Sequence, residues 1–162
     1  MIPRQPRADE AFWRRKRLED LSDAEWEQIC DGCGRCCLHK VEDAGSGRVY
    51  FTDLACHLFD TVTCRCSDYA HRLDRVPTCW RITPALARRL RWLPHSCAYR
   101  RLARGEDLPA WHPLVSGTAD SIHTAGVSVR GLTTPWHRPS VRRLKRHVRW
   151  DGEWHEVKGR RR

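Results

Sequence analysis

Hydrophobic residues recur at helical spacing only in short stretches, and most of these stretches begin at a capping residue. Ser22-Asp-Ala-Glu25 has the pattern of a capping box, in which the side chains of Ser22 and Glu25 each accept from an unpaired backbone N–H. Thr83-Pro84 is typical of an N-cap followed by proline at the first helical position. The pattern predicts short helices over residues 9–18, 22–30, 85–92, 97–104 and 141–148.

Strand-like segments are fewer. Residues 38–41 and 48–52 flank a turn-like Glu-Asp-Ala-Gly-Ser-Gly segment, which predicts an antiparallel hairpin. A further short strand is expected over residues 127–130. Residues 53–77 show no clear period, and residues 108–113 contain two prolines and are expected to be extended.

Composition limits the kind of protein that this chain can form. With 162 residues, of which 40% are hydrophobic, it can bury one modest core. No apolar run is long enough for a transmembrane helix, and the charged first 17 residues lack the apolar region of a secretory signal. We therefore expect a cytoplasmic protein without a membrane span.

Cysteine is the residue type that points most directly to chemistry. Thiols stay reduced in the cytoplasm, and an odd number of cysteines cannot pair completely, so metal ligation is favoured over disulfides. It is also favoured over inert packing, because four cysteines fall within eight residues beside two glycines. All nine cysteines are therefore candidate metal ligands: Cys30, Cys33, Cys36, Cys37, Cys56, Cys64, Cys66, Cys79 and Cys97.

The densest motif is Cys30-x2-Cys33-x2-Cys36-Cys37, in which Gly32 and Gly34 allow sharp turns. Adjacent side chains diverge, so Cys36 and Cys37 are expected to serve different metals or different corners of a cluster. Two all-sulfur sites would need eight ligands, and one four-sulfur cluster would need four. Thiolates suit zinc, Cu(I) and iron–sulfur clusters alike, and we expect zinc or an iron–sulfur cluster. The predicted fold is mainly α with irregular loops and a short β-hairpin, a small metal-stapled single domain.

This motif resembles the CxxCxxCC signature of the YkgJ-type cysteine-cluster proteins, described as chelating zinc or iron. The later cysteines, Cys56, Cys66 and Cys79, are similar too, although Arg72 and Pro77 are separated here and adjacent in that family. The chain resembles its YcgN-like branch more closely, from about residue 12 to residue 130. That similarity includes Cys64 and rests on residues 21–26, 30–34, 36–40, 92–94, 97–100 and 107–113.

Several side chains are candidates for supporting the thiolates. Tyr69 and Arg72 are three residues apart and would share a helix face, and Arg72 and Arg35 are expected either to hydrogen-bond to sulfur or to lie on the surface. Structural roles are expected for the histidines that lie among or near the cysteines, namely His39, His57, His71, His95 and His112. No nucleotide loop or catalytic motif stands out, so no catalytic residue is assigned and a non-enzymatic role is favoured. The wider signature also occurs in flagellin lysine N-methylase, which leaves a methylase-like or metal-assisted enzyme as an alternative.

Charge divides the chain unevenly. Residues 127–162 hold 11 Lys/Arg and 3 Asp/Glu, which is +8 of the net +10. We therefore predict a cysteine-cluster metal-binding domain over residues 1–132 and a basic tail over residues 133–162. The tail could follow a phosphate backbone, with Trp136, Trp150 and Trp154 for stacking, lie on an anionic membrane surface, or be a solvated, partly disordered end. The function expected first is metal binding with a redox, sensing or cluster-handling role. The alternative is a nucleic-acid-associated protein with a structural zinc core.

Overall fold

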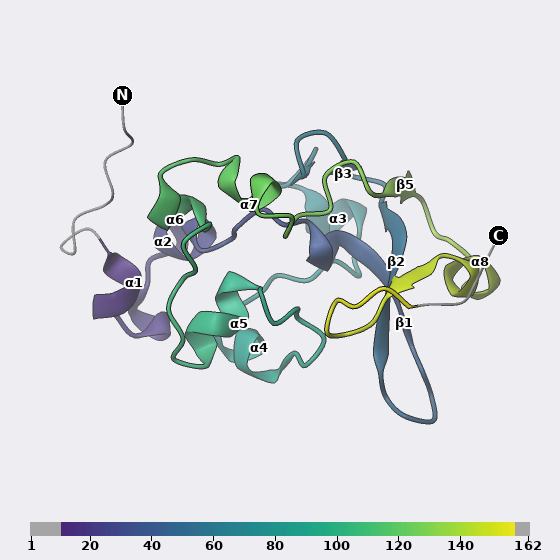
Figure 1. Cartoon of the computed structure of the whole chain (residues 1–162), viewed down its shortest axis with the longest axis horizontal. Coiled ribbons are helices and arrows are strands. Elements are labelled where there is room, and N and C mark those ends of the chain that lie inside the picture. Colours follow the sequence, from purple (N-terminus) through teal and green to yellow (C-terminus); the bar gives the residue numbers. More distant parts are fainter. Residues whose placement is uncertain (1–10, 158–162) are drawn as a thin grey trace. The chain divides into compact units, whose positions relative to one another are not determined.

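The computed structural model describes residues 11–157, and its contacts divide the chain into two compact units (Figure 1). We call residues 11–33 and 81–128 the helical unit. Residues 34–80 and 129–157 form the sheet unit. Each unit is therefore assembled from two separate stretches of the chain, and the two are described in turn.

Short helices make up the helical unit, and capping residues set where they begin. Ser22 precedes α2 (Asp23–Gln28) and forms both hydrogen bonds of the predicted capping box with Glu25. The Thr83 hydroxyl accepts from Leu86 N at the start of α4 (Pro84–Arg89), also as predicted. The remaining helices are α1 (Phe12–Arg15), the 3-10 helix η2 (Leu18–Asp20), α5 (Ala98–Ala103), α6 (Pro113–Ser116) and α7 (Ser121–Thr124).

The core of the helical unit forms around two aromatic residues. The rings of Trp26 and Tyr99 lie 4.5 Å apart between centroids, beside the fully buried Ile29. Trp26 Nε1 donates to the Ile82 carbonyl at 2.7 Å, and the Tyr99 hydroxyl donates to the Trp26 carbonyl at 3.2 Å. These bonds satisfy the polar ends of both aromatic side chains within an otherwise apolar core.

A mixed sheet organises the other unit, with β2 (Val49–Cys56) at its centre. β1 (Leu38–Glu42) pairs antiparallel with β2, which confirms the predicted hairpin. β5 (Thr134–Trp136) runs parallel to β2, and β6 (Val148–Trp150) runs antiparallel to it. The other elements are η3 (Arg35–Cys37), the β3–β4 pair (Phe59–Asp60 and Arg65–Cys66), α3 (Arg72–Arg75) and α8 (Val141–Arg146).

The structure corrects some details of the predicted fold. The expectation of short helices and a hairpin is confirmed, but the sheet is larger than a hairpin because residues 134–136 and 148–150 join it. Residues 127–130 form no strand. The predicted helix over residues 9–18 is interrupted at Lys16, whose extended backbone separates α1 from η2. The division at residues 132 and 133 stays a prediction.

Candidate metal-binding cysteines

The CxxCxxCC segment turns sharply, as its glycines require. Gly34 has φ of 75°, a conformation that side-chain-bearing residues rarely adopt. A Cβ atom at Gly34 would also lie 2.5 Å from the ring of Phe59 and 2.9 Å from Cys64 Sγ. Glycine is therefore required here both by the backbone conformation and by the lack of space. The 3-10 turn η3 follows at once and carries Cys36 and Cys37.

The nine cysteines are distributed over both units, and all nine are free thiols. Cys30, Cys33 and Cys97 belong to the helical unit. The sheet unit holds the other six: Cys36, Cys37, Cys56, Cys64, Cys66 and Cys79. The motif is thus shared between the units, and the structure places most candidate ligands in the sheet unit.

Three cysteines of the sheet unit, Cys36, Cys56 and Cys66, lie within electrostatic reach of a fourth, Cys79. Burial raises the pKa of the Cys79 thiol; the Arg72 guanidinium opposes this rise, and Cys36, Cys56 and Cys66 add to it. These neighbours come from separate elements, since Cys36 lies in η3, Cys56 ends β2 and Cys66 lies in β4. The tertiary structure therefore gathers thiols that are up to 43 residues apart in sequence.

The donor chemistry of this group fits a thiophilic metal, although its side chains do not form a closed coordination sphere. Among the described residues, no three His, Cys, Asp or Glu side chains stand in metal-binding geometry. Four thiols are the donor set of tetrahedral zinc sites and of four-sulfur iron clusters. Binding such a metal would require these side chains to turn towards a common point.

Two cations adjoin the same thiols. Lys40 Nζ donates to the carbonyl oxygens of Cys36 at 2.8 Å and Leu38 at 2.7 Å. Burial lowers the pKa of Lys40, and the nearby Cys36, Cys37 and Cys79 oppose that shift. Sequence reasoning did not select Lys40, because a lysine in a short strand is normally solvated; only its position beside the cysteines marks it.

Arg72 is the second cation, and it was predicted together with Tyr69. Its guanidinium carbon lies 3.7 Å from the centroid of the Tyr69 ring, and its Nη1 donates to the Tyr69 carbonyl at 2.7 Å. The stack holds the guanidinium in place, and its charge acts on Cys79. The expectation that Tyr69 and Arg72 support the thiolates stays a prediction with this geometry in its favour.

Arg35 has different surroundings from those expected. Its side chain is buried, and the guanidinium carbon lies 3.9 Å from the centroid of the Trp154 ring. Trp154 in turn stacks on Trp150, with ring centroids 4.6 Å apart and planes 7° from parallel. This stack gives Arg35 a packing role, and its predicted hydrogen bond to sulfur stays a prediction.

Cys64 and Cys97 differ from the other cysteines in their settings. Cys64 is buried, adopts φ of 59° and packs beside Gly34. Burial raises the pKa of its thiol, as it does at Cys79. Cys97 immediately precedes α5. Their predicted ligand roles stay untested, and the setting of Cys64 favours packing.

Asp31, within the CxxC loop of the helical unit, is a residue that sequence reasoning did not select. Its side chain is 4% exposed, and its Oδ1 accepts from Cys33 N at 2.9 Å. Its Oδ2 is buried without a hydrogen-bond partner in the described part of the chain. A buried oxygen without a partner is costly, so its position between Cys30 and Cys33 marks it as a further candidate donor.

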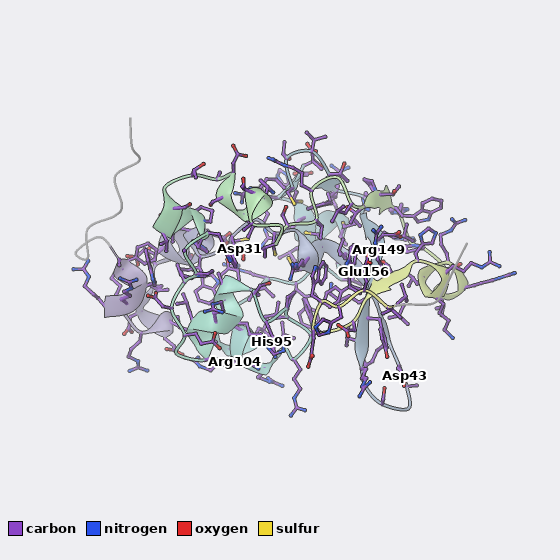
Figure 2. All side chains as sticks on the ribbon, viewed as in Figure 1. Asp31, Asp43, His95, Arg104, Arg149 and Glu156 are labelled. Carbon is purple, nitrogen blue, oxygen red and sulfur yellow. The ribbon has the colours of Figure 1, made fainter. Side chains whose placement is uncertain are left out.

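Two of the histidines near the cysteines, His112 and His95, make polar contacts within the helical unit. His112 is fully buried; its Nε2–H donates to the Ile29 carbonyl at 3.0 Å, and its Nδ1 accepts from Leu114 N at 3.0 Å. Burial lowers the pKa of this imidazole, which keeps it neutral with both nitrogens engaged. His95 Nδ1 lies 3.4 Å from an Arg104 nitrogen (both residues are labelled in Figure 2). Because both ring nitrogens of His112 are engaged in hydrogen bonds, neither is left to bind a metal.

The helices of the described residues differ from what a membrane-spanning helix needs. None of the helices in that part of the chain combines the length and the hydrophobicity that crossing a bilayer requires.

Comparison with known proteins agrees with the cysteine pattern. The profile of a family described as "Putative zinc- or iron-chelating domain", with the signature CxxCxxCC, matches residues 29–98. A UPF0260 protein of Rhodopseudomonas palustris strain BisA53 is 56% identical over 131 residues, covering 80% of this chain and 77% of the relative. A UPF0260 protein of Mesorhizobium japonicum is 58% identical over 120 residues, covering 74% and 81%.

A third relative extends the comparison. The UPF0260 protein of Gluconacetobacter diazotrophicus is 49% identical over 142 residues, covering 87% of this chain and 88% of the relative. No solved structure matches the chain. Identities near one half over most of both sequences show that the chain belongs to the UPF0260 family, the YcgN-like branch of the CxxCxxCC proteins that its cysteine motifs predicted.

Proposed function

We propose that this protein binds zinc or iron through thiolates of the sheet unit, with Cys36, Cys56, Cys66 and Cys79 as one ligand set. The observation that carries the proposal is that Cys36, Cys56 and Cys66 all lie close enough to Cys79 to raise the pKa of its thiol. They come from segments distant in sequence, so their grouping is not a consequence of the CxxCxxCC spacing. The CxxCxxCC family match supports the same chemistry.

Charge balance supports this choice of ligands. Four thiolates around one divalent ion leave an excess of two negative charges, and burying that excess without compensation is costly. Lys40 and Arg72 supply two positive charges beside the same cysteines. Cations placed around a thiolate-rich site stabilise it and tune the metal, as groups outside the ligand shell commonly do.

Short elements around the ligand set indicate that metal binding and folding are coupled. The chain between Phe59 and Trp80 contains two strands of two residues and the four-residue helix α3. Such elements gain little stability from their own hydrogen bonds. A metal held by Cys56, Cys66 and Cys79 would tie this segment to β2, and would contribute to the stability of the sheet unit.

Cys30 and Cys33 form a second, smaller set with Asp31. Both cysteines belong to the helical unit, whereas the four-cysteine set belongs to the sheet unit. The buried Oδ2 atom of Asp31 supports an oxygen donor beside the two thiols. The adjacent Cys37, which acts on Lys40, is assigned to neither set.

The test is metal analysis of anaerobically purified protein, with its visible spectrum. Iron with acid-labile sulfide and a brown colour would support a redox, sensing or cluster-handling role. Zinc in colourless protein would support a structural site, because four thiolates leave no position for water. Serine variants of Cys36, Cys56, Cys66 and Cys79 are each expected to lose the same metal equivalent, and Cys97→Ser, in the other unit, is the matched control. Full metal content in the four variants would refute this ligand set.

A further inference from the structure

The basic segment of residues 133–150 is held in place by the sheet. It contains six arginine or lysine residues and no carboxylate. β5 pairs with β2 before α8, and β6 pairs with β2 after it, so α8 is fixed at both ends (Figure 1). His147 Nδ1 also lies 2.7 Å from Asp53 Oδ1, and Asp53 N donates to the His147 carbonyl at 3.0 Å. The segment is therefore an ordered part of the sheet unit.

Positive charge is concentrated on the exposed side of this segment. Arg138, Arg142, Arg143 and Arg146 are exposed, and none of these four has a carboxylate partner within the described chain. Arg149 differs, because it lies 3.4 Å from Glu156 Oε1 (Figure 2). Like charges fixed on one short helix repel one another, and a bound polyanion would relieve that repulsion.

An exposed aromatic ring adjoins these charges. Trp136 is 36% exposed, and the Arg143 guanidinium carbon lies 4.1 Å from the centroid of its ring. The main chain of Trp136 is fixed, because it pairs with Cys56 in the sheet and its carbonyl lies 3.0 Å from His39 Nε2. An indole on a fixed main chain beside arginines offers a base a face for stacking, and the arginines offer phosphates their counter-charges.

We propose that Trp136 and the exposed arginines of α8 form a binding surface for single-stranded nucleic acid. The arginines would neutralise consecutive phosphates, and Trp136 would stack on a base. This surface lies outside both proposed ligand sets. An anionic membrane fits less well, because α8 has six residues and Val141 is its only exposed apolar side chain.

The experiment is fluorescence anisotropy of a labelled, mixed-sequence RNA strand of about 20 nucleotides, titrated with the full-length protein as purified. Salt is varied between about 50 and about 200 mM, the range over which phosphate contacts weaken strongly. Arg142→Glu/Arg146→Glu removes two phosphate contacts and leaves the Arg143 stack in place. Its matched control is Arg89→Glu/Arg91→Glu, because these exposed residues of the helical unit give the same change in net charge.

We expect binding of the unchanged protein to weaken steeply with salt. The α8 variant should bind more weakly than the control, and the slope of log affinity against log salt should be smaller by about 1.4, at about 0.7 for each lost contact. Trp136→Leu should weaken binding about five-fold or more with little change in slope, and Trp136→Phe should restore most of it.

Three outcomes would overturn the proposal. Equal losses of RNA affinity in the α8 variant and its control would show that binding depends only on the overall charge of the protein. Tighter binding to duplex DNA than to single strands would show that Trp136 does not stack on bases, because the bases of a duplex are already stacked on one another. Sedimentation with phosphatidylglycerol vesicles in the absence of RNA binding would identify a membrane surface instead. Since the metal-ligand cysteines are unchanged in every variant, metal content separates failure of this proposal from failure of the metal site.

Discussion

Lys40 Nζ donates a hydrogen bond of 2.8 Å to the carbonyl oxygen of Cys36, four residues earlier in the chain. The bond brings an ammonium group from β1 back over the 3-10 turn that carries Cys36 and Cys37. Cys37 and Cys79 also act on Lys40, so the cation lies near three cysteines of the sheet unit. Its charge is placed where a metal–thiolate site would need compensation.

Replacing Lys40 with methionine should weaken metal binding about ten-fold or more, the usual effect of removing a group that supports metal ligands. Methionine keeps the length of the side chain and removes only its charge and donors. Competition with a chromophoric chelator measures the affinity. Lys16→Met is the control, since Lys16 pairs with Glu25 at 2.6 Å in the helical unit. Unchanged affinity in Lys40→Met would show that the cation does not support the site.

Asp31→Asn should have opposite effects on the metal-free and metal-loaded protein. The amide oxygen can still accept from Cys33 N, while the buried negative charge is removed and an NH2 group takes the place of Oδ2. We therefore expect the metal-free protein to be no less stable and the metal affinity to fall, as measured by thermal unfolding and chelator competition. Asp43→Asn, in the exposed turn of the hairpin, should leave the metal affinity unchanged (Figure 2). An unaltered affinity would exclude Asp31 as a ligand.

Removal of metal by a chelator together with a reductant should lower the melting temperature or abolish cooperative unfolding. The cause is the segment between Phe59 and Trp80, whose two strands have two residues each and whose helix has four, so that these elements are too short to be stable by themselves. Circular dichroism during heating, with metal content measured on the same sample, checks this. A demonstrably metal-free sample with the original melting temperature would contradict it.

Ser22→Ala should destabilise the protein by about 1 kcal/mol, the usual cost of losing an N-cap. The substitution removes the acceptor of Glu25 N and half of the capping box. The free energy of unfolding from denaturant titration of metal-loaded protein measures the effect, and Ser22→Thr should preserve most of the stability. A loss as large in the threonine variant would point to packing rather than capping.

Acid should weaken the contact between Asp107 and Arg14 in a defined pH range. The hydrogen bond from Arg14 lowers the pKa of Asp107 to about 2, despite the opposing effect of burial, and Trp13 Nε1 contributes a further bond of 2.9 Å. Because the pKa in the folded protein lies below the unfolded value of about 3.9, the contact stabilises the protein above that pH. Its contribution is lost as the pH falls from about 4 to about 2.

The test is to measure the free energy of unfolding of the unchanged protein and of Asp107→Asn across this pH range. The difference between the two should be constant near neutral pH and shrink below about pH 4. Loss of metal from protonated thiols affects both proteins equally, so it cancels in the difference. A gap that does not change with pH would show that the carboxylate charge is not the stabilising feature.

The sequence by itself determined the features that depend on neighbouring residues. Ser22 and Thr83 cap their helices as predicted, and Ser140 caps α8 in the same way, because a cap needs only a side-chain oxygen within reach of an amide three residues later. The β1–β2 hairpin followed from two strand-like runs around a turn. The cysteine spacing likewise predicted the family, since the CxxCxxCC motif is contiguous in the chain.

Only the tertiary structure decided the relationships between distant segments. β5 and β6 have three residues each, too few to show an alternating pattern, and they exist as strands because β2 supplies their hydrogen-bond partners. Their pairing converts the predicted basic tail into an ordered surface with Arg143 on Trp136. The grouping of Cys36 with Cys79, and the position of Lys40 beside them, arise in the same way. Pairing across a sheet depends on which strands meet, and no local pattern in the sequence encodes that choice.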